Sequence, residues 1–258
     1  MALPRLLNSS FRSQPQGSAA DFNRWLETPA GQALLQSEHT LLKEILPRMV
    51  GYTALQCVVG KPYPLLDGCY LRQQVYMGAE AHPGIGVQAR PCTFPIRKHS
   101  LDLLVLHHTL DFDDDPHQML RNAARTLVPG GTVVVIGFNP SSLWGLMRLF
   151  GAGARGMPWQ ARFLSAQRVG DWLSVLGCVP EGLESRFHSP PRSRIGRWLA
   201  WLGDQIWSRH GSFYIMVARR RAATMRPARP RFVFPERAPN VVPVSLSQWR
   251  QKPGETLE

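Results

Sequence analysis

Two adjacent histidines, His107 and His108, directly follow a continuous apolar run at residues 101–106. Such a run is typical of a strand buried on both faces of a parallel sheet, so both imidazoles are expected at a strand end. Imidazole titrates near neutral pH and can act as a general base or a polar contact. We therefore take both as candidate site residues, with His108 preferred as the catalytic candidate, the alternative being a purely structural histidine pair.

Four aspartates, Asp111, Asp113, Asp114 and Asp115, follow these histidines. Carboxylates can bind metal ions, but Asp115 stands before a proline, and this pair is typical of a helix start. The other three suit a solvated turn before the positive end of that helix. We therefore expect no metal site.

The 258 residues are 44% hydrophobic, enough for one main domain with a sizeable core. We place this domain at residues 21–220, after a flexible leader at 1–20. No run of 18 apolar residues and no secretory signal are present, and the four cysteines contain no CxxC pair. A reducing, cytoplasmic location is expected.

The formal net charge of +12 is concentrated near the carboxyl end. Six arginines lie close together without an acid between them: Arg219, Arg220, Arg221, Arg226, Arg229 and Arg231. A basic arm is compatible with nucleic acid or an anionic membrane surface, but the prolines around it disfavour a regular helix. Residues 221–258 are accordingly expected to be a disordered tail.

The order of helices and strands indicates an α/β protein. A helix is predicted from Thr28, as its cap, to about Pro47. A strand at 101–106, a helix at 115–127 and a strand at 132–138 form a βαβ unit, which requires a right-handed crossover and a parallel sheet. Further elements are expected as strands at 54–59, 73–77, 179–185 and 212–218 and helices at 65–74 and 165–177, with Pro129-Gly130-Gly131 ending the helix of the βαβ unit.

Several short motifs occur in a fixed order within residues 25–220. They are Phe94-Pro95-Ile96, Ser100-Leu101-Asp102, Asp115-Pro116-His117, Arg125-Thr126-Leu127, Pro129-Gly130-Gly131, the stretch from Gly137 to Leu146, Asp171-Trp172-Leu173 and Ser185-Arg186-Phe187-His188. Their order and spacing resemble the class I S-adenosylmethionine-dependent methyltransferases, and more narrowly the YafS group of bacterial proteins.

This resemblance implies a Rossmann-like fold: a mostly parallel seven-stranded sheet with helices on both faces and an antiparallel last strand. It also implies S-adenosyl-L-methionine as cofactor, bound in a crevice at the carboxyl ends of the strands, beside Gly60 and His107. The positions that match cofactor contacts of the superfamily are Val59, Gly60, Lys61, Glu80, Arg90, Pro91, Cys92, His107 and His108, with Glu80 as the acid for the ribose hydroxyls.

Aromatic and basic residues gather in two inserts, at about 141–164 and 189–210, where the superfamily builds its substrate cover. Asn139, Trp144 and Arg162 are the substrate candidates. The implied activity is methyl transfer to a small-molecule or macromolecular acceptor of hydrophobic or anionic character. The alternative is an inactive module that binds RNA, a membrane surface or a protein partner, because the loop at Gly60 keeps one glycine where the superfamily has several and Arg90 replaces its usual acid.

Overall fold

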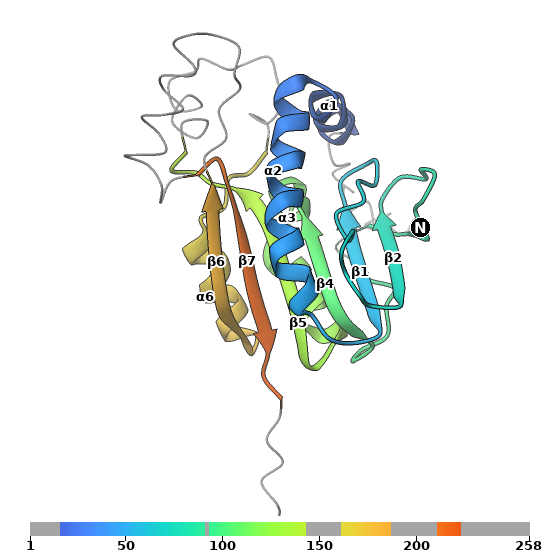
Figure 1. Ribbon diagram of the computed structural model, residues 1–258, viewed down its shortest axis with the longest axis vertical. Helices are drawn as coiled ribbons and strands as arrows, with labels where there is room; N and C mark the ends of the chain where they lie inside the picture. The colour runs from blue at the N-terminus through green and yellow to red at the C-terminus, as the bar shows by residue number, and fades with distance from the viewer. Residues whose placement is uncertain (1–15, 91–92, 143–160, 187–210, 223–258) are drawn as a thin grey trace, which may run out of the picture. The chain divides into compact units, whose positions relative to one another are not determined.

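The fold is a single seven-stranded sheet in the order β3-β2-β1-β4-β5-β7-β6 (Figure 1). The computed structural model describes residues 16–90, 93–142, 161–186 and 211–222. Strands β1 to β5 run parallel to one another. Strand β7 lies between β5 and β6 and runs antiparallel to both. This order confirms the predicted fold. The strands are β1 (Thr53–Val58), β2 (Gln73–Gly78), β3 (Val87–Gln88), β4 (Leu101–His107), β5 (Leu127–Phe138), β6 (Cys178–Arg186) and β7 (Phe213–Arg220).

Helices cover both faces of the sheet (Figure 1). On one face pack α1 (Gln16–Leu26), α2 (Pro29–Ile45) and a short 3₁₀ turn (Leu46–Arg48); on the other pack α4 (Pro116–Thr126) and α6 (Ala166–Val175). A one-turn helix, α3 (Thr109–Phe112), joins β4 to α4. Within the described ranges, no helix is both long and apolar enough to span a bilayer.

The helix starts follow the capping residues predicted from the sequence. The side-chain oxygens of Thr28, Asp115 and Ser165 accept hydrogen bonds from backbone N–H groups in the first turns of α2, α4 and α6. Each such bond satisfies one of the N–H groups that the first turn of a helix leaves free. Local chemistry therefore fixes where these three helices begin.

Two predicted segments have a different structure. The helix predicted at 65–74 is wrong, because a turn at 65–68 ends in Gly68 at φ 89° and the chain then enters β2. The predicted stop at residues 129–131 lies inside β5 instead. There Gly130 has φ 84°, and the pairing of β4 with β5 shifts register, so these residues form an irregularity in the strand.

Helix α1 overlaps the segment predicted to be a leader, and several predicted segments fall outside the described residues. Helix α1 begins at Gln16, inside the segment expected to be a flexible leader. Most of both aromatic inserts and nearly all of the basic tail, together with Pro91, Cys92 and Trp144, lie outside the described residues.

Candidate functional site

The sheet register brings most of the predicted cofactor residues to one edge. Val58, the last residue of β1, pairs with Gly78, the last residue of β2, and Cys57 pairs with Leu106 of β4. Because β1 to β4 are parallel, the loops after these strands all leave from the carboxyl edge. Gly60 and Glu80, in the loops after β1 and β2, and His107, the last residue of β4, therefore lie at the same edge.

The loop after β1 is held by helix α1. Gly60 has φ 79°, and a Cβ atom built on it would lie 1.7 Å from the Nδ2 atom of Asn23. The amide oxygen of Asn23 accepts a hydrogen bond of 3.3 Å from the Lys61 backbone N–H, and the Lys61 ammonium pairs with Glu27 at 2.6 Å. Glycine is required at residue 60 because both its conformation and its neighbour exclude a side chain.

The loops after β2 and β3 are open to solvent. Glu80 lies two residues beyond β2, and its carboxylate is exposed and contacts His82 Nε2 at 3.3 Å. Arg90 lies two residues beyond β3 with an exposed side chain, and its carbonyl accepts the Thr93 N–H. This half of the edge therefore offers an exposed carboxylate, paired with His82, and a loop that is open to solvent.

At the end of β4 the two histidines meet a buried glutamate from helix α2. Glu38 Oε2 lies 3.0 Å from His107 Nε2, and Glu38 Oε1 lies 2.8 Å from His108 Nε2. The other ring nitrogen of His108 lies 2.9 Å from Asp111 Oδ2, which also accepts the Phe138 backbone N–H. All four ionisable side chains are buried, so they form a closed polar network in the core.

Glu38 and Asp111 are the functional candidates that sequence reasoning missed. Glu38 stands on the apolar face of α2, four residues after Leu34 and three before Leu41, and this placement was the available signal. The expectation of a solvated acidic turn is wrong for Asp111 and Asp113, which are 1% and 4% exposed. It holds for the exposed Asp114, and Asp115 caps α4 as predicted.

The pKa values of the residues in this network are shifted in different directions. Burial raises the pKa of Glu38, but the neighbouring His108 and the hydrogen bonds from both histidines outweigh burial and lower it to about 2. Burial lowers the pKa of His108, but Glu38 and Asp111 together raise it to about 9. For His107 burial wins, and its pKa is lowered. Without a bound cation, the network at neutral pH contains ionised Glu38, charged His108 and neutral His107.

This geometry does not suit His108 as a general base. Its ring is fully buried, stacks on Phe138 with a centroid separation of 4.1 Å, and meets the ring edge-on of Phe22 at 5.5 Å. Phe22 comes from α1 and is itself fully buried against Phe112. The space beside His107 and His108, where the sequence predicted a crevice, is thus filled by side chains of the protein.

The two described substrate candidates make local contacts. The Asn139 side-chain oxygen accepts the Ser141 N–H at 3.0 Å, and the Arg162 guanidinium donates to the Asp114 carbonyl at 2.8 Å. Asn139 directly follows β5, and Arg162 lies shortly before α6. Their part in substrate binding stays a prediction.

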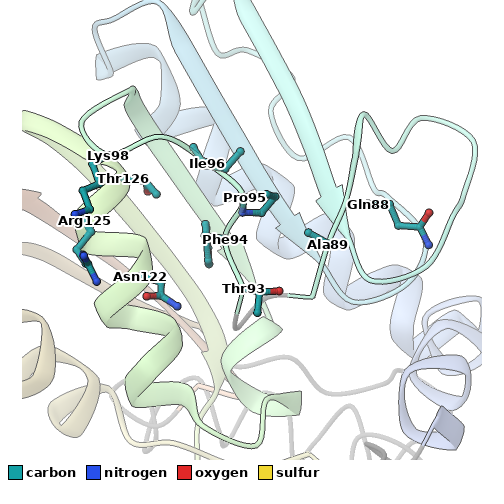
Figure 2. A pocket seen from close by; sticks show the side chains of 10 residues that line it. All are labelled: Gln88, Ala89, Thr93, Phe94, Pro95, Ile96, Lys98, Asn122, Arg125 and Thr126. Atoms are coloured by element: carbon teal, nitrogen blue, oxygen red, sulfur yellow. The ribbon is translucent and has the colours of Figure 1, made fainter.

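A separate groove of about 610 Å³ lies between the segment leading into β4 and helix α4. Figure 2 shows Lys98 and Arg125 together at one end of it, with Phe94 between the segment and the helix. Apolar lining also comes from Pro95 and Ile96. The groove therefore combines apolar surface with a local positive charge.

Comparisons with known proteins agree with this architecture. Residues 71–135 match the family model described as a methyltransferase domain. The Escherichia coli protein YafS is 33% identical over 198 residues, which cover 76% of this chain and 80% of YafS. Among solved structures, a SAM-dependent methyltransferase from Thermotoga maritima matches with a TM-score of 0.60 at 17% identity, covering 80% of this chain and 98% of that one.

A Haloferax volcanii methyltransferase-like protein, solved with its Trm112 activator, matches with a TM-score of 0.57 at 13% identity over 79% of this chain and 97% of that one. At such identities, the two structures show a shared fold. The match to YafS covers most of both chains at 33% identity, and this shows a shared family as well as a shared fold. The chain therefore belongs to the family of YafS and has the fold of the class I methyltransferases.

Proposed function

We propose that this protein transfers a methyl group from S-adenosylmethionine to an acceptor of hydrophobic or anionic character. The observation that supports the proposal most is the placement of Gly60 and Glu80 in neighbouring loops at the carboxyl edge, next to the open loop at Arg90. This is the edge at which open α/β sheets bind nucleotides.

The residues of this half of the edge fit an adenosyl group. Neither Gly60 nor Gly78 has a side chain, but a Cβ atom on Gly60 would clash with Asn23 and one on Gly78 would lie 3.2 Å from Ile85 Cδ1, so side chains of the protein already lie against both glycines. The exposed carboxylate of Glu80 would accept hydrogen bonds from the ribose hydroxyls. The loop at Arg90 would face the adenine.

The other half of the edge is more restricted. Asn23 lies against Gly60, and Phe22 lies over His108. The methionyl end of a whole cofactor would therefore compete with these α1 side chains for space. We propose that α1 moves away from the loop after β1 when the cofactor binds.

When bound, the cofactor supplies a methyl group on a sulfonium that is already a good leaving group. The protein then has to align the acceptor and exclude water from the site, and no invariant catalytic side chain is needed. Phe112, which lies on α3 and not on α1, would remain as an apolar side chain near the end of β4. The Lys98 and Arg125 end of the groove lies beside the start of β4, at the edge of the sheet opposite Gly60 and Glu80, so the character of the acceptor rests on the sequence.

The contacts of Phe22 and Asn23 favour a second candidate, a fold retained as a binding module without methyl transfer. In that case α1 would stay in place and its two side chains would close the edge permanently. The two candidates differ in whether the protein binds the cofactor at all.

Calorimetric titration of the purified full-length chain with S-adenosylmethionine and S-adenosylhomocysteine tests the proposal. We expect saturable binding of both, strongly weakened in Glu80→Ala because the ribose loses its acceptor. The matched control is Glu181→Ala, which removes a comparably exposed carboxylate on β6 and should leave affinity unchanged. No heat of binding at millimolar ligand, or equal affinity in both variants, would refute the assigned site.

A further inference from the structure

The side chains of Glu38, His107 and His108 form a group whose chemistry the proposed function does not use. Their exposed fractions are 0 to 2%, and one ligating atom from each lies within 4.8 Å of the others. We propose that this group binds one divalent transition-metal ion of the zinc type, which links helix α2 to the end of β4.

The three side chains offer the ligands that such ions prefer. Two imidazole nitrogens and one carboxylate are a common donor set for zinc and other first-row metals. Ligands held about 2.1 Å from an ion are about 3.4 Å apart at the tetrahedral angle that zinc prefers. The Glu38 oxygens lie 3.0 Å and 2.8 Å from the two Nε2 atoms, so the three side chains must separate by about half an ångström to admit the ion.

Asp111 supplies the contact that orients a metal-bound histidine. Its Oδ2 atom lies 2.9 Å from His108 Nδ1 and is fixed by the Phe138 N–H. A proton on Nδ1 directed at Asp111 leaves the lone pair of Nε2 facing the Glu38 carboxylate. In a carboxylate–histidine–metal arrangement, Asp111 would hold the Nδ1 proton and the ion would take the place of the proton between Nε2 and Glu38.

Two carboxylates, those of Glu38 and Asp111, contact the two imidazoles of this buried group. Such a set of carboxylate and imidazole donors suits a divalent first-row ion. Asp111 Oδ1 is also buried and has no hydrogen-bond partner within the described part of the chain, so a further donor oxygen stands beside the group.

The backbone is consistent with a held ligand. His108 adopts φ 52°, a left-handed conformation that non-glycine residues occupy at some cost in energy. This conformation turns the chain sharply after β4 and brings the rings of His107 and His108, 4.9 Å apart, to the same carboxylate. The turn therefore places adjacent residues as two ligands of one ion.

Metal titration of the full-length protein tests this proposal independently of cofactor binding. The protein is stripped with a chelator and titrated with Zn²⁺ against a chromophoric competitor, and with Co²⁺ by visible absorption. We expect one equivalent of each to bind, with a Co²⁺ spectrum typical of nitrogen and oxygen ligands. In Glu38→Gln and His107→Gln, affinity should fall at least about 100-fold, and in Asp111→Asn about 10- to 100-fold.

The matched control is His39→Gln, which changes the neighbouring residue of the same helix, a half-buried histidine 3.8 Å from Asp67, and should keep full affinity. The proposal is overturned if the stripped wild-type protein binds neither ion, whatever the variants do. It is equally overturned if His39→Gln loses the ion while Glu38→Gln and His107→Gln keep it. Circular dichroism of each variant shows whether it folds. If a variant does not fold, the titration of the wild type alone decides whether the protein binds the ion.

Discussion

The pKa of His108 predicts how the stability of the metal-free protein depends on pH. The group has a pKa of about 9 in the folded chain against an ordinary value of 6.5, a difference of about 2.5 units. Each unit is worth about 1.4 kcal/mol, so the raised pKa corresponds to about 3 kcal/mol of stability. Because the folded form binds the proton more tightly, this contribution is complete below pH 6.5 and is lost as the pH rises to 9.

Other buried groups act mainly outside this window. The lowered pKa of Glu38 adds stability above its ordinary pKa of 4.5, which is lost on acidification. The lowered pKa of His107 contributes stability that is present above pH 6.5 and lost below it. The raised pKa of Asp111 costs stability as the pH rises above its ordinary value of 3.8. The fall between pH 6.5 and 9 therefore reports chiefly on His108.

Urea unfolding of the chelator-treated protein at several pH values from 6.5 to 9.5 measures the effect. We expect the free energy of unfolding of the wild type to fall by about 3 kcal/mol over this range. In His108→Gln the fall should vanish, because no proton is taken up at this position, whereas His39→Gln should keep it. A wild type as stable at pH 9 as at pH 6.5, or a fall that persists in His108→Gln, would refute the reasoning.

Three further substitutions test the packing beside the site and at the opposite edge of the sheet. Gly60→Ala should lower stability more than Gly177→Ala. Both glycines have positive φ, which costs alanine about 1 kcal/mol, but only Gly60 also has a side chain against it, that of an asparagine on α1. Thermal unfolding of the two variants measures the difference, which is the cost of the steric clash. Asp102→Ala should lower stability by about 1–3 kcal/mol in urea titrations, since its carboxylate accepts two backbone N–H groups at 2.9 Å at the start of β1; an unchanged midpoint would contradict this. Phe22→Ala should cost about 3–5 kcal/mol in the same assay, while Tyr70→Ala, at a residue 80% exposed, should stay close to wild type; similar values for both would show that α1 does not pack on the core.

Much of the fold is predictable because its determinants are local. The apolar run that forms β4 and the Asp115-Pro116 start of α4 each act within a few residues. The turn at Gly68 was missed because the leucines before it suit a helix, and only their burial in the core on the α1–α2 side of the sheet shows where they point. Helix α1 was missed because the polar residues before it are typical of a leader, and its packing on the core depends on Phe22 and Leu26.

The sequence by itself determined the central βαβ unit, the parallel sheet and the position of the histidines at a strand end, since these depend on periodicity and capping over short distances. Only the tertiary structure decided the partners of those histidines. Glu38 lies 69 residues before His107, and no local pattern links the two. Their contact depends on how α2 crosses the sheet, which brings a glutamate from an apolar helix face onto the end of β4. Burying a carboxylate costs free energy unless cationic partners surround it. The network therefore forms only in the folded chain.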